Sequence, residues 1–368
     1  MVTSSVTSTS DAKPEPAQRW IGFDVIRLLS LIAITVHHFV WVMWYVPNIS
    51  QIQWHWGWNF INSYARAISF SGHSVLFLSC LLIAKSESHP IKTLRVVAFV
   101  AAGWILFSFF EKDQNAVFWV WDIYPLIILG LLTALAVRQI GDKAVYALGL
   151  LGFILTWIPF WEFKAFDALS LQWRHWLVGD CSVDLADWPI LPWVGFLWAP
   201  YALGIWIRNS ELSGSRWWVK FHRFELVGWP VLLIAAVPQL GAYYRIILGS
   251  SFACYSFRQP PVVFWSHFIF IVFLLRISML AKVQSTLFSS GIMRGISNLR
   301  LSRSFGLFYL VHYTLIETVA ALWQAPISVS PHLSFLLFVA ILPVTELLVR
   351  LLEAAFRFVI NRRRSAPL

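Results

Sequence analysis

The chain has 368 residues, of which 58% are hydrophobic and 12% are charged, and its mean hydropathy is +0.68. This composition excludes an ordinary pair of soluble domains, because apolar runs long enough to cross a bilayer recur along the whole chain. The formal net charge of +10 does not indicate nucleic-acid binding, because the basic residues alternate between two sets of connecting segments instead of clustering on one face. We therefore expect one all-α, polytopic integral membrane protein with no nucleic-acid partner.

The N-terminal segment, MVTSSVTSTSDAKPEPAQ, is polar and contains many Ser, Thr and Pro residues. Such a composition cannot bury enough apolar surface to fold, so we expect a disordered cytoplasmic tail over residues 1–18. The first apolar segment is long and carries internal charges, which is unlike a cleavable signal sequence. We expect a transmembrane domain over residues 19–356 and a basic cytoplasmic tail over residues 357–368.

The first apolar segment, residues 19–44, is long enough to cross a bilayer but carries Asp24, Arg27, His37 and His38. On a helix, Asp24, Arg27 and His38 are separated by nearly whole turns and share one face. Ionisable side chains inside a membrane usually face the interior of a helix bundle or a water-filled cavity. These residues are therefore candidate site residues. The alternative is that Asp24 and Arg27 form an interfacial pair and that the histidines serve packing.

Ten apolar segments, most of them of crossing length, follow one another along the chain. They cover roughly residues 21–46, 63–84, 95–110, 117–137, 144–161, 190–208, 226–247, 261–280, 303–323 and 333–352. The segments between them alternate between many and few Lys and Arg residues. Because positive charge stays on the cytoplasmic side, this alternation predicts that both termini are cytoplasmic and that the protein is multi-pass in the plasma (inner) membrane.

Two stretches outside the first crossing carry further candidate site residues. Lys92 and Arg95 follow the second crossing, and Tyr309-Leu310-Val311-His312 lies within the ninth. Taken alone, the basic pair agrees with the positive-inside rule, and a single histidine on an apolar helix is most often a packing residue.

The spacing of Asp24, Arg27 and His38, D-x-x-R followed after ten residues by His, resembles the first-helix motif of acyltransferase family 3. In the second crossing, VLFLSCLLIAKS over residues 75–86 is similar to the FFxLSGFLxA segment of that family, with Cys80 in place of a usual Gly. Together with the later motifs, the resemblance extends over most of the chain.

The later motifs depart from the family pattern in part. Lys92 and Arg95 stand in place of a basic R-x-x-R pair, and Lys keeps the charge of Arg but loses its bidentate geometry. Residues 309–312 resemble the late YLxH element of the family. The Ser-Tyr pair usually found just ahead is replaced by Phe-Gly at 305–306, and Ser304 is displaced by one position. This departure puts a hydroxyl role of the element in doubt.

The sixth crossing resembles a second branch of membrane acetyltransferases, the heparan-α-glucosaminide N-acetyltransferase-like proteins, which carry a PLxPWxG…LG pattern. The matching positions are Pro189, Pro192, Trp193, Gly195 and Gly204. Prolines and tryptophans are also common at interfacial helix starts without any functional role. This likeness supports the transmembrane acyltransferase superfamily and does not select a branch.

The resemblance implies an enzyme that transfers an acyl group, commonly acetyl, from cytoplasmic acyl-CoA to a sugar, glycan, lipid-linked sugar or small-molecule acceptor. The residues that it implies for holding the CoA phosphates are Arg27, Lys92 and Arg95. His38 would take a proton from the acceptor or carry the acyl group itself, Asp24 would hold Arg27 in place, and His312 would be a further site residue. The chain's 3 cysteines show no metal-binding spacing, so no metal is expected.

Two other classes of membrane protein compete with the acyltransferase interpretation. A multipass transporter or flippase would also carry ionisable residues inside the membrane, but the sequence shows no inverted repeat and no paired broken helices. A glycosyl-transferring membrane enzyme would usually show acidic pairs in long loops. The acidic cluster at residues 180–187 is the one candidate, and its composition is that of a solvated loop.

The cysteines follow the predicted topology. Cys181 and Cys254 fall in outer loops, and Cys80 falls within the second crossing. In an oxidising outer compartment the two outer cysteines can form a disulfide, and the alternative is that they are two unrelated free thiols.

Overall fold

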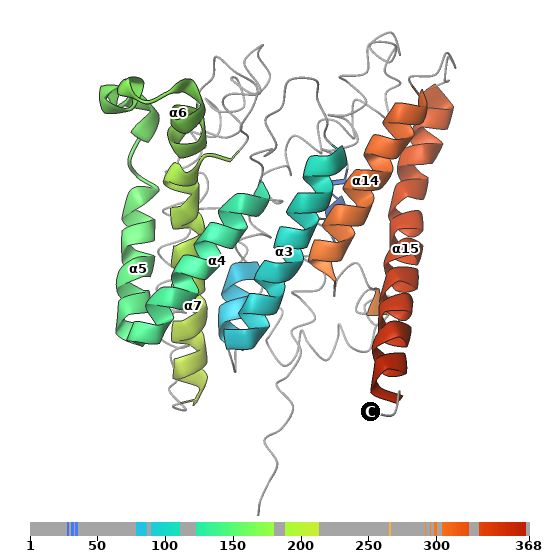
Figure 1. Cartoon of the computed structure of the whole chain (residues 1–368), viewed down its shortest axis with the longest axis horizontal. Coiled ribbons are helices and arrows are strands. Elements are labelled where there is room, and N and C mark those ends of the chain that lie inside the picture. The colour runs from blue at the N-terminus through green and yellow to red at the C-terminus, as the bar shows by residue number, and fades with distance from the viewer. Residues whose placement is uncertain are drawn as a thin grey trace, which may run out of the picture.

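The computed structural model describes residues 79–86, 90–110, 123–179, 188–212, 304–323 and 331–365, together with residues 28, 31, 32, 34, 35, 265, 291, 295, 298 and 299. Over these residues all regular elements are helices and no strand occurs, so the all-α prediction is confirmed for this part of the chain (Figure 1). The named helices are α3 (Pro90–Phe110), α4 (Ile123–Ile140), α5 (Asp142–Leu155), η1 (Phe160–Glu162), η2 (Lys164–Ala168), α6 (Leu171–Val178), α7 (Ile190–Leu212), α14 (Phe305–Trp323) and α15 (Pro331–Ser365).

Within the described helices, α4 and α7 are long and apolar enough to cross a membrane. The helices α3, α4, α5, α7, α14 and α15 fall on six of the ten predicted crossings, and each differs from the prediction at one end or both. The ten-crossing topology itself stays a prediction.

Three of the helix ends that differ from prediction have a local cause in proline or in charge pairs. Pro90 begins α3 five residues earlier than expected, because proline is favoured in the first turn of a helix, where no backbone N–H is needed. Helix α5 ends at Leu155 instead of 161, because Pro159 disfavours a helical conformation at the residue before it. Helix α15 continues to Ser365, beyond the predicted end at 352. Its i,i+4 pairs Glu346–Arg350 (2.6 Å) and Glu353–Arg357 (3.3 Å) favour that helix.

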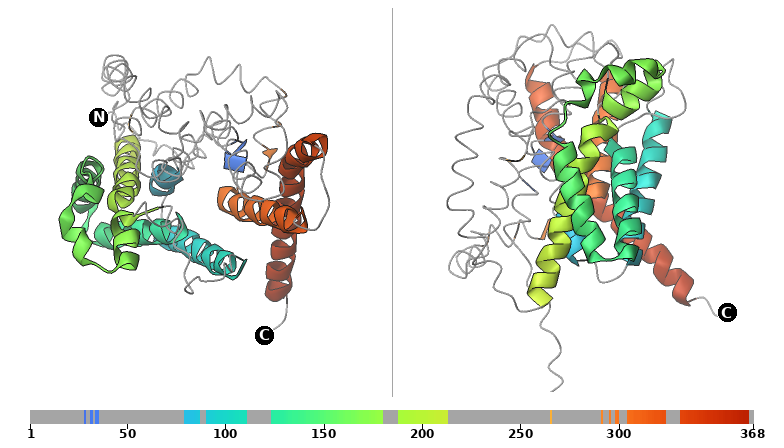
Figure 2. Two further views of the ribbon diagram at one scale, coloured as in Figure 1. Left: turned by 90° about the horizontal axis from the view of Figure 1, so that it is seen from above. Right: turned by 90° about the vertical axis from the view of Figure 1, so that its left-hand side faces the viewer.

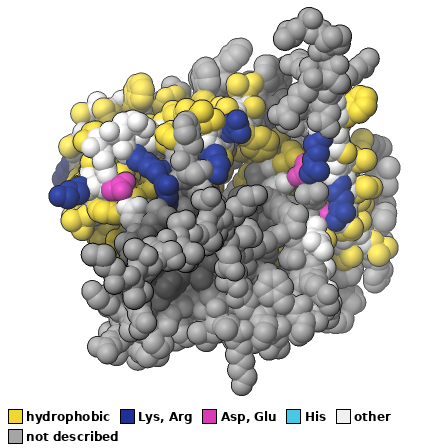
Figure 3. All heavy atoms as spheres, turned by 90° about the horizontal axis from the view of Figure 1, so that it is seen from below, with side chains coloured by type: hydrophobic (Ala, Val, Ile, Leu, Met, Phe, Trp, Pro, Cys, Tyr) yellow, Lys and Arg dark blue, Asp and Glu magenta, His cyan; other side chains and the backbone are white. Residues whose placement is uncertain are grey.

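The six long helices alternate in direction. In Figure 1, α3, α5 and α14 rise from the lower end of the molecule, and α4, α7 and α15 descend to it. Helix α14 lies between α3 and α15 and packs against both, and α4 lies against α3, α5 and α7 (Figures 1 and 2). Lys and Arg side chains gather on the lower face, as Figure 3 shows from below.

Glycine brings α5 and α7 into backbone contact. A Cβ built on Gly152 would lie 2.9 Å from the carbonyl oxygen of Gly195 and 3.0 Å from Trp198 Cβ. One built on Gly149 would overlap Ala202. Small residues at such a crossing allow close van der Waals packing, which drives helix association where no water is available to be expelled. This close packing fixes α5 against α7, and the Asn209 amide of α7 adds hydrogen bonds to Asp142 Oδ2 (2.7 Å) and to the Tyr146 hydroxyl (3.0 Å) of α5.

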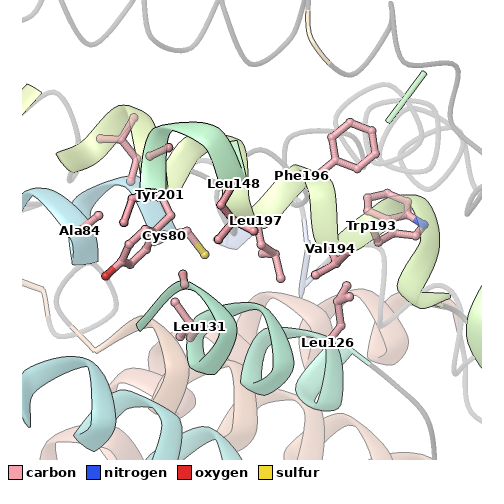
Figure 4. Close-up of a cluster of buried hydrophobic side chains, with 14 of the residues drawn as sticks. Cys80, Ala84, Leu126, Leu131, Leu148, Trp193, Val194, Phe196, Leu197 and Tyr201 are labelled. Atoms are coloured by element: carbon pink, nitrogen blue, oxygen red, sulfur yellow. The ribbon is translucent and has the colours of Figure 1, made fainter. Parts of the chain in front are cut away.

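The main core lies where α4, α5, α7 and the helical segment 79–86 meet (Figure 4). Trp193, Phe196 and Tyr201 of α7 are its largest fully buried side chains. Gly204 of α7 allows the backbone of Leu81 to approach closely. The resulting core joins the second predicted crossing to the fourth, fifth and sixth.

A buried hydrogen bond connects this core to the eighth predicted crossing. The indole N–H of Trp265 donates to Thr156 Oγ1 at 2.9 Å, and the Thr156 hydroxyl donates to the carbonyl of Phe153 at 2.6 Å. The Trp265 ring also lies 5.0 Å from the Phe153 ring and 5.7 Å from the Phe196 ring, measured between centroids. Thr156 is therefore the acceptor that satisfies a buried indole.

We expect Thr156→Val to lower the free energy of unfolding by about 1–3 kcal/mol, because it leaves the buried Trp265 indole without this acceptor. Thermal and denaturant unfolding in detergent measure the change. Thr133→Val is the matched control, because the Thr133 hydroxyl donates to the carbonyl of Leu129 at 2.7 Å within its own helix. Equal losses in the two variants would contradict a role for the bond to Trp265.

Candidate functional site

His312 lies in the second turn of α14 and is completely buried. Its ring is stacked on Phe308 at 4.9 Å between centroids, with an interplanar angle of 15°. The Tyr309 ring meets it edge-on at 5.3 Å. Helical geometry explains this local arrangement, because residues three and four positions apart lie on one face.

The hydrogen bond of His312 determines its tautomer when the ring is neutral. The Nδ1 atom lies 3.0 Å from the carbonyl oxygen of Phe308. A carbonyl oxygen can only accept, so Nδ1 carries the hydrogen and donates it. In the neutral ring this leaves Nε2 as an acceptor, which is the form that a general base requires.

Phe308 connects this histidine to the first predicted crossing. Phe308 and Leu31 are both fully buried and share a cluster with Leu28 and Leu342. Thr35, one turn beyond Leu31, is also fully buried, and its hydroxyl donates to the Leu31 carbonyl at 2.8 Å. The face of the first crossing that carries positions 31 and 35 therefore packs next to His312.

The predicted basic pair lies on α3 itself and not in the segment before it. Lys92 and Arg95 occupy the first two turns of α3, and both side chains are exposed. Thr93 between them is completely buried, and its hydroxyl makes no hydrogen bond among the described residues. The first turns of α3 thus present two cations outward and one hydroxyl inward.

The basic pair and His312 lie on neighbouring helices at different heights. Helices α3 and α14 meet at Gly103, where an added Cβ would lie 4.0 Å from Leu310 Cδ1 and 3.6 Å from Tyr124 Cε1. Both helices rise in the same direction in Figure 1. Eight residues separate Arg95 from Gly103 and two separate Leu310 from His312. Their combined rise places His312 about 15 Å above Arg95 along the helix axes.

Several predicted site residues fall outside the described part of the chain. They are Asp24, Arg27, His37 and His38, and the same holds for Cys181 and Cys254. The described residues of the first crossing, 28, 31, 32, 34 and 35, are helical, and Leu31 and Thr35 among them are buried. Cys80 is buried and not in a disulfide. In the described residues no group of three or more His, Cys, Asp and Glu side chains is placed to hold a metal ion.

The positions that matched the second acetyltransferase branch serve packing where the structure describes their surroundings. Trp193 is fully buried and meets Trp188 edge-on at 4.7 Å between ring centroids. Gly195 faces Gly152, and Gly204 faces Leu81. The Leu191–Pro192 peptide bond is cis. Packing therefore explains the residue types at positions 193, 195 and 204 without a role in catalysis.

The sequence reasoning missed Glu353. This residue lies on α15 and accepts a hydrogen bond from the hydroxyl of Ser304, next to the start of α14. A glutamate one residue beyond the predicted end of the tenth crossing, four residues before Arg357, has the spacing of a surface ion pair. That spacing gives no indication of a contact with α14.

Comparison with protein-family models, with curated proteins and with solved structures finds no match to this chain.

Proposed function

We propose that this protein is a membrane-embedded acyltransferase that moves an acyl group, in the first place acetyl, from cytoplasmic acyl-CoA to a hydroxyl or amine of a sugar, glycan or lipid-linked acceptor. The observation that carries the proposal is a buried histidine whose ring is oriented by the Phe308 carbonyl, one helix away from an exposed basic pair. In the proposed orientation the lower, Lys- and Arg-bearing face of Figure 3 is cytoplasmic.

The difference in height between the basic pair and His312 fits an extended acyl-CoA donor. Lys92 and Arg95 bind the CoA phosphates at the cytoplasmic end of α3, because guanidinium and ammonium groups form strong charge-assisted bonds to phosphate. The extended pantetheine arm then covers the distance of about 15 Å to His312. This places the thioester carbonyl inside the membrane, next to a base that is shielded from bulk water.

The transfer balances without a cofactor. The base takes the proton of the acceptor O–H or N–H, and the acceptor oxygen or nitrogen bonds to the thioester carbonyl carbon. The C–S bond breaks, and the leaving thiolate receives the proton to give free CoA. His312 serves as this base or as the group that polarises the acceptor, and His38 serves as the second base or as a transient acyl carrier.

His38 enters the proposal through helical spacing. In a continuous helix, position 38 follows Leu31 by two turns and Thr35 by three residues, so it shares the face of those two buried side chains. Asp24 and Arg27 fall on the same face in the other direction. We expect Asp24 to hold Arg27 where it assists the basic pair.

The first test is transfer itself. Purified protein in lipid nanodiscs, supplied with radiolabelled acetyl-CoA and a panel of sugar and lipid-linked sugar acceptors, is expected to release free CoA and label an acceptor. Thiol release without acceptor label would indicate acyl-CoA hydrolysis at the same site. If the protein releases no thiol and binds no acyl-CoA, but takes up a solute in vesicles, the transporter interpretation replaces the proposal.

Removing the basic pair is expected to weaken donor binding. We expect Lys92→Ala and Arg95→Ala each to raise the KM for acyl-CoA about tenfold with little change in acceptor dependence, because each removes one phosphate contact. Lys92→Arg should keep full activity. Steady-state kinetics with acetyl-CoA and with a donor that lacks the nucleotide phosphates separates the contributions. An unchanged KM in both alanine variants would contradict the cytoplasmic phosphate site.

The histidine pair of the first crossing provides an internal control. We expect His38→Ala to abolish transfer with normal expression and insertion, because it removes a base without adding a charge to the membrane. His37 points about 100° away on a helix, so His37→Ala should retain most activity. An inactive His37 variant beside an active His38 variant would show that the motif is misaligned by one residue.

A further inference from the structure

We propose that Glu353 of α15 is a positioning residue for His312, acting through Ser304 at the start of α14. This inference rests on the proposed acyl transfer, because it assigns a function to the placement of His312. It concerns a residue of the last helix, outside all of the motifs that the sequence singled out.

The contact between the two helices is a charge-assisted hydrogen bond. The Ser304 hydroxyl donates to one carboxylate oxygen of Glu353. The other carboxylate oxygen accepts from Arg357 Nη2 at 3.3 Å. The Glu353 side chain is 20% exposed and that of Arg357 62%. Arg357 thus balances the charge from the exposed side, while Glu353 contacts Ser304 at the start of α14.

Ser304 is in turn bonded to the residue that orients His312. Its carbonyl accepts the backbone N–H of Phe308 at 2.8 Å, the first bond of α14. The carbonyl of Phe308 accepts from Nδ1 of His312 at 3.0 Å, and the two rings are stacked. Two successive helical turns therefore connect Glu353 to the tautomer and orientation of His312.

The position of Glu353 on α15 supports a role in placing α14. Ile341, Thr345 and Val349 are buried, and Glu353 continues their four-residue spacing. Glu353 thus lies at the end of an inward-packing helix face, one residue beyond the predicted tenth crossing, and its carboxylate reaches the residue that precedes α14. By contrast, the 2.6 Å bond between Glu346 and Arg350 joins two residues of α15 itself.

The test uses four variants in the acyl-transfer assay. Glu353→Ala and Ser304→Ala are each expected to lower kcat about ten- to a hundredfold with an unchanged KM for acyl-CoA, because a displaced base loses rate and not donor affinity. Glu353→Gln, which keeps an acceptor oxygen for Ser304, is expected to restore most of the rate. Arg357→Ala, which leaves the Ser304 bond in place, is the matched control and should stay within about threefold of wild type.

The double variant separates positioning from general destabilisation. If the Ser304–Glu353 hydrogen bond alone causes the loss in kcat, the double variant Ser304→Ala, Glu353→Ala is no slower than either single variant. If Glu353→Ala does not insert, Ser304→Ala and Glu353→Gln carry the test. A normal kcat in Ser304→Ala would overturn the inference. So would a double variant whose loss in kcat is the product of the two single losses, or an Arg357→Ala variant that loses as much kcat as Glu353→Ala. An inactive wild type would instead remove the proposed function.

Discussion

Replacing His312 by alanine is expected to lower the rate of acyl transfer by at least about a hundredfold, because a positioned general base contributes about 10²–10⁴ to a rate. His312→Asn provides the sharper variant. Its amide N–H can replace Nδ1 as the donor to the Phe308 carbonyl, but it has no nitrogen to take a proton. Single-turnover kinetics with bound acyl-CoA measures the chemical step directly.

The two His312 variants separate chemistry from packing. Both should be slow, and the asparagine variant should be closer to wild type in thermal stability, since the hydrogen bond to Phe308 persists. Thr314→Val is the matched control on the same helix, because the Thr314 hydroxyl donates to the Leu310 carbonyl at 2.9 Å and has no part in the proposed step. Wild-type rates in His312→Asn would show that the ring is a packing residue.

Gly152→Ala is expected to lower the free energy of unfolding by about 1–3 kcal/mol, the usual cost of overpacking. The new Cβ would lie 2.9 Å from the Gly195 carbonyl oxygen and 3.0 Å from Trp198 Cβ, and a backbone atom cannot move aside as a side chain can. The two helices must separate instead. Unfolding in detergent measures the loss, and co-purification of fragments split between α5 and α7 measures their association.

Gly103→Ala is the matched substitution. The nearest atoms to a Cβ at that position are 3.6 and 4.0 Å away, which is ordinary van der Waals contact. Alanine favours a helix over glycine by about 1 kcal/mol in water, so this variant should be neutral or more stable. A loss of stability in Gly152→Ala, together with unchanged or higher stability in Gly103→Ala, would assign the loss to the backbone contact between Gly152 and Gly195. A stable Gly152→Ala protein would contradict the close crossing of α5 and α7.

The sequence by itself determined where the six long helices of the described part of the chain lie, but not α6, η1 and η2. Long apolar runs bounded by charged or proline-containing segments were enough to predict α4 and α7, because every peptide group must be paired where water is absent. It also selected Lys92, Arg95 and His312 as candidates, through the resemblance of their surroundings to acyltransferase motifs. Ionisable groups in apolar surroundings are conspicuous whether or not the fold is known.

Only the tertiary structure decided which of these helices are neighbours. Apolar periodicity is similar on every membrane helix, so it cannot predict that Gly152 meets Gly195, or that Leu31 packs with Phe308. The bond from Ser304 to Glu353 joins residues 49 positions apart, and neither residue reveals its partner locally. Such contacts depend on the close packing of particular side chains, which is a property of the assembled bundle and not of any one segment.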